Sequence, residues 1–192
     1  MADKVLVVPI RKFELYSVSY NKAFTEALRK PHWVTNENYV FYLGVKYSNE
    51  WVVVPRGYGT DGASVPPAFQ SILPVFGKDG ACAILHDWLC EYGYVWNRNP
   101  LTSEVTKRFL SRLEIDSIFL EALGVVGVEK RTIDLVRLGF MAHRTWSNPP
   151  VPNLDLAKQK LELNLAQANG WSQFDGSQLW DVIDSPPVWA VV

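Results

Sequence analysis

Residues 39–55 read Tyr-Val-Phe-Tyr-Leu-Gly-Val-Lys-Tyr-Ser-Asn-Glu-Trp-Val-Val-Val-Pro. Aromatic and β-branched residues fill both ends of this stretch, and the polar run Ser48-Asn49-Glu50 lies between them. The pattern predicts an antiparallel β-hairpin with strands at 39–47 and 51–55. Pro55 ends the second strand, because proline has no N–H to donate to a neighbouring strand.

The segments before this hairpin predict one more strand and one short helix. Residues 13–18 alternate weakly between polar and apolar side chains, which favours a strand. Residues 21–30 have a helical composition, and Pro31 ends that helix.

The remainder of the chain is predicted to be mainly helical, since its apolar residues recur at helical spacing. We expect helices at residues 78–92, 102–123, 129–146 and 154–168, the second of them capped by Thr102 or Ser103. Three prolines in residues 148–153 predict a linker. The sequence therefore predicts an α+β fold: an N-terminal antiparallel β-hairpin or small sheet packed on three to four C-terminal helices. We expect one domain over residues 1–147, followed by an extension of linker, helix and Trp-containing tail over 148–192.

Composition excludes several classes of protein. The chain has 192 residues, 48% of them hydrophobic, and a net charge of −1, so it has neither the low hydrophobicity nor the high charge of a disordered chain. We expect no nucleic-acid partner, because there is no basic excess. We expect no membrane span, because no apolar run approaches about 18 residues. We also expect no signal peptide. Cys82 and Cys90 are too few for a disulfide framework.

The first candidate for chemistry is the adjacent pair His86 and Asp87, within the helix predicted for residues 78–92. Adjacent side chains on a helix diverge by about 100°, yet a small ligand off the side of the helix can contact both. The alternative interpretation is a histidine hydrogen-bonded to the surrounding structure.

A second candidate is Asp116, which falls in the middle of an apolar helical stripe. A carboxylate buried there needs a cation, several backbone donors or a metal ion as its partner. Arg112, four residues earlier, is the simplest partner, and His86 or a metal ion is the alternative. The apolar neighbours at helical spacing are Phe109, Leu113, Phe119, Leu120 and Leu123.

A third candidate is Asp61, in the compact segment of small residues and prolines at 59–67. It either stabilises a turn or a helix cap, or faces His86 and Asp87 across a cleft. In the second case one divalent ion, Zn²⁺ or else Mn²⁺ or Mg²⁺, is held by Asp61, His86, Asp87 and Asp116. Asp87 is then the general base for a metal-bound water.

These residues lie in four short motifs, and the chain resembles a phage and prophage protein family of unknown function that carries them together. The resemblance covers residues 40–144 and implies a bacteriophage origin without supplying an activity. Pro67 and Cys90 depart from the family pattern, where Arg and Tyr are frequent. The motifs are Val54-Pro55-Arg56-Gly57-Tyr58, Thr60-Asp61-Gly62-Ala63-Ser64-Val65-Pro66, His86-Asp87-Trp88-Leu89 and Asp116-Ser117-Ile118-Phe119.

Two functions follow as hypotheses. The first is a structural protein of the virion, at the tail or baseplate, made in the host cytoplasm and contacting other virion proteins through residues 148–192. The Asp and His cluster is then a buried hydrogen-bonded network. The alternative is a metal-dependent hydrolase that cleaves a peptidoglycan amide of the host cell wall through the Asp/His site.

Overall fold

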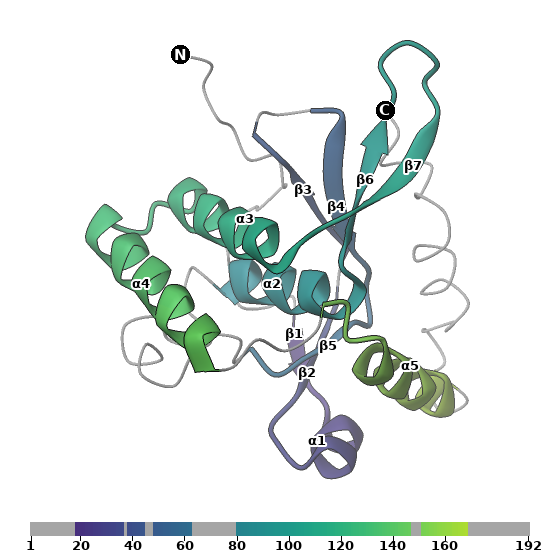
Figure 1. Ribbon diagram of the computed structural model, residues 1–192. Coiled ribbons are helices and arrows are strands. Elements are labelled where there is room, and N and C mark those ends of the chain that lie inside the picture. The colour runs from purple at the N-terminus through teal and green to yellow at the C-terminus, as the bar shows by residue number, and fades with distance from the viewer. Residues whose placement is uncertain (1–17, 37, 45–47, 63–79, 147–150, 169–192) are drawn as a thin grey trace.

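The computed structural model describes residues 18–36, 38–44, 48–62, 80–146 and 151–168. These ranges form two antiparallel sheets and five helices, with the helices mostly in the second half of the chain (Figure 1). The predicted α+β class is confirmed. Residues 63–67 of the compact segment at 59–67 and the tail at 169–192 lie outside the described residues, as does the strand predicted at 13–18 except for Val18.

The predicted hairpin is confirmed and forms half of the larger sheet. Its strands are β3 (Tyr39–Tyr42) and β4 (Glu50–Val54), with Phe41 opposite Val52. The strand order is β3-β4-β6-β7, so β4 is a central strand. Its run from Trp51 to Val54 is fully buried, which explains the unbroken apolar sequence there.

The other half of this sheet corrects the helix predicted for residues 102–123. Residues 94–98 and 105–109 instead form an antiparallel hairpin, β6 (Tyr94–Arg98) and β7 (Val105–Phe109). The side chains of Tyr94, Val95 and Trp96 are buried, and aromatic and β-branched residues favour a strand over a helix. The turn between the two strands is closed by the Asn99 N–H, which donates to the Glu104 carbonyl over 2.8 Å.

Helix α3 (Arg112–Val125) therefore begins later than Thr102 or Ser103. Its N-cap is Ser111, whose hydroxyl accepts from the Glu114 N–H while the Glu114 carboxylate accepts from the Ser111 N–H. This reciprocal pair is a capping box, which satisfies N–H groups that a helix start leaves unpaired.

Helix α2 (Gly80–Tyr92) lies at the centre of the molecule and confirms the helix predicted for 78–92. Nearly all its side chains are buried, because β4, α3 and α5 all contact it. Helix α4 (Lys130–Trp146) packs on α3 on the side away from the larger sheet, and confirms the helix predicted for 129–146. Helix α3 contacts both α2 and α4, and Figure 1 shows the three helices side by side.

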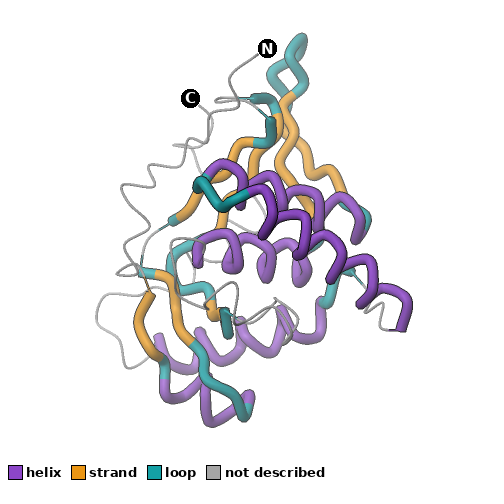
Figure 2. Tube along the Cα trace, turned by 90° about the vertical axis from the view of Figure 1, so that its left-hand side faces the viewer, coloured by secondary structure: helices purple, strands orange, loops and turns teal. Residues whose placement is uncertain are grey.

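The smaller sheet lies at the opposite end of the molecule from the turn of the β6–β7 hairpin (Figures 1 and 2). Its order is β1 (Val18–Tyr20), β2 (Trp33–Thr35) and β5 (Gly59–Thr60). Helix α1 (Lys22–Leu28) connects β1 to β2 and confirms the short helix predicted for 21–30. Asn21 is its N-cap and accepts from the Phe24 N–H.

Helix α5 (Leu154–Ala168) packs against α2 and confirms the helix predicted there. The Asn153 N–H donates to the Cys90 carbonyl over 3.0 Å, and the side chains of Ala157, Lys160 and Leu161 are buried. This part of the predicted extension therefore shares a core with α2.

No helix within the described ranges is both long and apolar enough to span a membrane.

Candidate active site

His86 and Asp87 point to different sides of α2, because adjacent helical side chains diverge by about 100°. His86 faces α3 and α4, where it contacts Asp116, Phe119 and Phe140. Asp87 faces β5 and α5, and lines a pocket. The helix thus separates two polar groups that are neighbours in the sequence.

The first group is centred on Asp116, which is 3% exposed. His86 Nε2 lies 3.1 Å from Asp116 Oδ1, and Arg112 Nε donates to the same oxygen over 3.1 Å. Arg144, from α4, donates to Asp116 Oδ2. Both oxygens of this carboxylate are therefore engaged by donors from α2, α3 and α4, and the group joins these three helices.

The titration of this group follows from its burial and its partners. Burial lowers the pKa of His86, although the hydrogen bond to Asp116 opposes the shift. For Asp116, burial favours a higher pKa, but the hydrogen bond from His86 and the charges of Arg112 and Arg144 outweigh it, so the pKa lies below its usual value. Both pKa shifts favour one state, in which His86 is neutral and donates from Nε2 to an ionised Asp116.

Cys90 lies one turn after His86 on α2, with Sγ 3.8 Å from His86 Nδ1 and 3.9 Å from Nε2. Burial raises the pKa of the Cys90 thiol to about 12. Because the thiolate is the nucleophilic form of cysteine, this environment does not activate Cys90 for nucleophilic attack.

The second group is centred on Asp87, which is 4% exposed. The Thr60 hydroxyl donates to Asp87 Oδ2 over 2.6 Å and accepts from the Gly62 N–H over 3.0 Å. Thr60 sits at the end of β5, where pairing with Trp33 of β2 fixes its position. The smaller sheet and the glycine after it therefore orient one oxygen of Asp87.

Asp87 borders a pocket of about 140 Å³ between α2, the end of β5 and α5. The pocket collects side chains from parts of the chain that are far apart in sequence, and most of them are polar. They are Lys30, His32, Asp61, Asp87, Cys90, Glu91, Asn153, Leu156 and Lys160.

The cations of this pocket are already paired. Lys30 donates to Asp61 at the more exposed end, and Lys160 donates to Glu91 in the buried part. Asp87 has no such partner among the described residues, and its Oδ1 makes no hydrogen bond to them. Glu91 Oε2 likewise makes no close hydrogen bond within the described part of the chain, although the Tyr58 hydroxyl is near enough to lower the pKa of Glu91.

Burial governs the pKa values of the pocket. It raises the pKa of Asp87 well above the usual value, and the charge of Asp61 adds to the shift, while Lys160 and the Thr60 hydroxyl oppose it. Burial also raises the pKa of Glu91 against the opposing charge of Lys160. Burial lowers the pKa of His32.

The four residues predicted to share one metal ion thus fall into two groups. The structure brings His86 to Asp116 on one side of α2, and brings Asp61 and Asp87 to the pocket on the other side. Across the described ranges, no three His, Cys, Asp or Glu side chains are placed so that they could hold a metal ion. The metal site stays a prediction.

Sequence reasoning missed Thr60 beside the pocket and several residues that line it, among them Glu91, His32 and Lys160. Thr60 was quoted only as part of a motif, although it is the residue that contacts Asp87. Glu91 follows Asp87 by four residues on a helix whose side chains are nearly all buried, a spacing that could have identified it. His32 and Lys160 carried no local signal, because only the folded chain brings them to α2.

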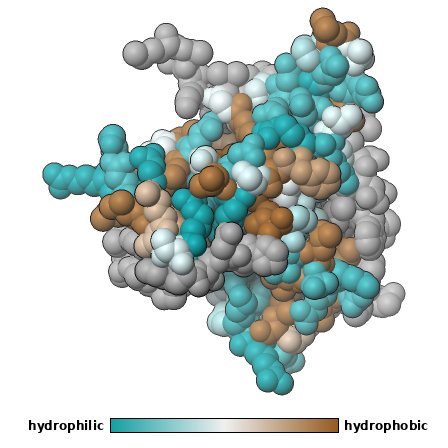
Figure 3. All heavy atoms as spheres, in the orientation of Figure 1, coloured by the Kyte–Doolittle hydropathy of each residue, from teal (hydrophilic) through white to brown (hydrophobic). Residues whose placement is uncertain are grey.

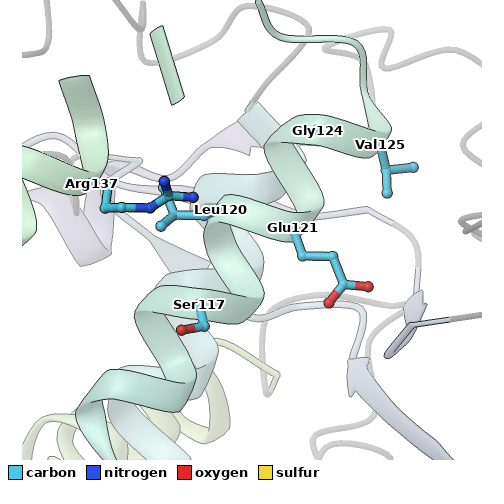
Figure 4. A pocket seen from close by; sticks show the side chains of 6 residues that line it. All are labelled: Ser117, Leu120, Glu121, Gly124, Val125 and Arg137. Carbon is cyan, nitrogen blue, oxygen red and sulfur yellow. The ribbon is translucent and has the colours of Figure 1, made fainter. Parts of the chain in front are cut away.

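A larger open groove of about 510 Å³ lies between α3 and α4. Figure 4 shows Arg137 reaching over Leu120 while Glu121 points away from it. The polar side chains here have structural partners: Glu121 accepts from the Gly44 N–H, Arg137 donates to Asp134, and the Ser117 hydroxyl donates to the Leu113 carbonyl. We therefore take the smaller pocket as the candidate active site, because it contains a buried carboxyl oxygen that has no hydrogen-bond partner among the described residues.

Comparison with known proteins adds a family. A family model described as "Protein of unknown function (DUF1353)" matches residues 33–139, from β2 into α4. The chain belongs to the DUF1353 family. The match includes Thr60, Asp61, Asp87 and Glu91, whereas Lys30, His32 and Lys160 lie outside it. No curated protein and no solved structure was found to match this member of the DUF1353 family.

Proposed function

We propose that this DUF1353 protein is a hydrolase whose reaction takes place in the Asp87 pocket. One observation carries the proposal: Asp87 is buried, its Oδ2 is held by Thr60, and its Oδ1 borders the pocket without a hydrogen-bond partner among the described residues. A carboxyl group that keeps its proton near neutral pH can give that proton to a leaving group, and burial raises the pKa of Asp87 in this direction.

The reaction we assign to the pocket is hydrolysis of an amide. Water adds its oxygen to the carbonyl carbon and passes one proton to Asp61, which lines the same pocket. The C–N bond breaks as the nitrogen takes the proton of Asp87 and leaves as an amine. A proton then returns from Asp61 to Asp87. Bacteriophage origin, which the sequence resemblance implies, makes a peptidoglycan amide of the host cell wall the substrate we propose.

The test is the release of free amino groups from purified peptidoglycan. Asp87→Asn keeps the size of the side chain and its acceptor for Thr60 but carries no acidic proton, so we expect a rate at least about 100-fold lower. Asp134→Asn, which removes an exposed carboxylate of α4 at a distance from the pocket, is the matched control and should retain the rate. Absence of new amino groups with the unsubstituted protein contradicts the proposal.

The predicted metal-dependent version of the reaction is tested on the same samples. The residues of the His86 group already bind one another, so we expect the rate to survive dialysis against a chelator. One equivalent of Zn, Mn or Mg by elemental analysis, lost in Asp87→Asn together with the activity, would instead favour the metal-dependent site.

The structural role in a virion is the second candidate, and the outer face of α4 favours it. Leu135, Leu138 and Met141 are 44%, 60% and 53% exposed, and they lie on a helix that packs on α3 with its opposite side. Exposed apolar side chains that cluster are typical of protein contacts. Figure 3 shows hydrophobic atoms on this side of the molecule and at the turn of the β6–β7 hairpin, where Leu101 is 92% exposed.

Assembly is measured by incorporation into phage particles. In that role Leu138→Glu should abolish incorporation while leaving the melting temperature of the isolated protein within about 2 °C, because exposed positions contribute little to stability. Normal incorporation of Leu138→Glu would show that this face is not the contact.

A further inference from the structure

We infer that the Asp87 pocket binds a primary ammonium group, with Asp87 Oδ1 and Glu91 Oε2 as its acceptors. The inference rests on the proposed function and specifies its substrate: an amide whose leaving group is a primary amine.

Among the described residues of the pocket, two carboxyl oxygens make no close hydrogen bond, whereas both lysine ammonium groups are already paired. Lys30 and Lys160 supply the ammonium groups that line it, and each already donates to a carboxylate, Asp61 and Glu91 respectively. Two carboxyl oxygens, Asp87 Oδ1 and Glu91 Oε2, are buried without a hydrogen-bond partner among the described side chains and backbone. Glu91 has the Tyr58 hydroxyl beside it as a further donor, whereas a ligand that satisfies Asp87 Oδ1 must bring N–H or O–H donors, because a buried acceptor without a partner costs free energy.

The balance of charge favours a cation over a neutral donor. Three carboxyl groups and two lysines line the pocket, so one negative charge remains once Asp87 gives up its proton as the ligand binds. That charge belongs to Asp87, since the other two carboxylates have lysine partners. A ligand with one positive charge completes the pairing, and paired charges are the form in which buried ions are stable.

Geometry selects an ammonium group over a larger cation. Asp87 and Glu91 are four residues apart on α2, so their side chains lie on the same face of the helix, one turn apart. An ammonium group has three donors that can spread between two such acceptors. The volume of about 140 Å³ holds a few non-hydrogen atoms, which suits the end of an alkylammonium chain.

The same contacts suit the reaction proposed above. When the amide nitrogen takes the proton of Asp87, the amine leaves beside a carboxylate that has just become negative. Before Asp61 returns its proton to Asp87, the amine takes up the proton that the carboxylic acid product releases, and it becomes an ammonium ion next to the ionised Asp87 Oδ1. The pocket therefore binds the amine product, and a simple alkylammonium ion should act as an analogue of this product.

The test uses ethylammonium chloride as the probe on the full chain, with binding measured by isothermal titration calorimetry. Three controls accompany it. Sodium chloride at equal concentration controls for ionic strength, acetamide tests a neutral amide, and sodium propionate tests an anion. We expect ethylammonium alone to bind, and its affinity to fall at least tenfold in Asp87→Asn. The exposed carboxylate variant Asp134→Asn should bind as the unsubstituted protein does.

Three results would overturn the inference: no binding of ethylammonium, equal binding of acetamide or propionate, or unchanged affinity in Asp87→Asn. Binding of Mg²⁺ or Zn²⁺ that ethylammonium cannot displace would assign the two oxygens to a metal and overturn it as well. Failure is separable from that of the proposed function. Ethylammonium binding without release of amino groups from peptidoglycan refutes hydrolysis alone, and release without ethylammonium binding refutes the ammonium site alone.

Discussion

Asp87 is a buried carboxyl group whose hydrogen-bond partner is the neutral Thr60 hydroxyl, whereas Asp61 and Glu91 have lysine partners. Its environment therefore favours the protonated form, which is how proteins produce a carboxylic acid that retains its proton near neutral pH. The neighbouring His86 is instead a neutral hydrogen-bond donor, and its partner Asp116 is held as a carboxylate.

Replacing Asp87 by Asn should change how stability depends on pH. The raised pKa of Asp87 means that its carboxyl ionises more readily in the unfolded chain, so it lowers the stability of the native protein as pH rises above about 4. Relative to Asp87→Asn, the unsubstituted protein should lose stability between pH 4.5 and pH 8. Urea denaturation of both proteins at the two pH values measures this, and parallel pH profiles would contradict the prediction.

Asp116→Ala should destabilise the fold. It removes the acceptor for His86, Arg112 and Arg144, and breaking such a buried pair costs about 3 kcal/mol. The pKa of Asp116 is lowered, so its contribution is present above the unfolded pKa near 3.9 and is lost as pH falls through the folded value. Denaturation at pH 7 and pH 3 should show a smaller difference between variant and unsubstituted protein at pH 3.

At the scale of elements, the pocket depends on how closely β5 approaches α1. A Cβ added at Gly59 of β5 would overlap the Phe24 ring of α1, which is fully buried. This contact keeps β5, and hence Thr60 and Asp61, in position beside Lys30.

Two glycine substitutions should therefore have opposite effects. Gly59→Ala should cost about 1–3 kcal/mol, because the Phe24 ring has to move out of a filled core. Gly124→Ala, in α3, should stabilise by up to about 1 kcal/mol, because its new methyl group meets only Ile133 at 3.8 Å and alanine favours a helix. Thermal denaturation compares the two, and equal effects would mean that the approach of β5 to α1 is not tight.

At the scale of the whole molecule, α5 completes a pocket whose acids come from the region matched by the family model. Lys160 of α5 is 4% exposed, donates to Glu91, which lies 69 residues earlier in the sequence, and sits 5.0 Å from the centre of the Tyr58 ring. A helix outside the family match thus neutralises one of the two acids that α2 contributes to the pocket.

A double-mutant cycle measures that contribution. Lys160→Met should destabilise by about 3–5 kcal/mol, because it leaves the Glu91 carboxylate buried without its cation. Glu91→Gln should restore much of the loss when combined with Lys160→Met, since a neutral amide costs less to bury than an unpaired charge. Additive effects in the double variant would show that the two side chains are not coupled.

The local sequence predicted those elements whose pattern is complete within one segment. The hairpin of β3 and β4, the buried helix α2 and the helices α1, α4 and α5 each carry their own periodicity and boundary residues. The prediction was wrong for residues 102–111, because Thr102 and Ser103 resemble a helix cap. Only pairing with β6 selects the strand β7 over a helix.

The sequence by itself determined the α+β class and singled out Asp61, His86, Asp87 and Asp116 as acids and a base that need partners. Only the tertiary structure decided which partners they have, because hydrogen bonds such as those from Thr60 to Asp87 and from Arg144 to Asp116 join segments 27 and 28 residues apart. It also decided that α2 keeps His86 and Asp87 apart. Periodicity reports which side of a helix a residue occupies, whereas the identity of the group across that side depends on the packing of the whole chain.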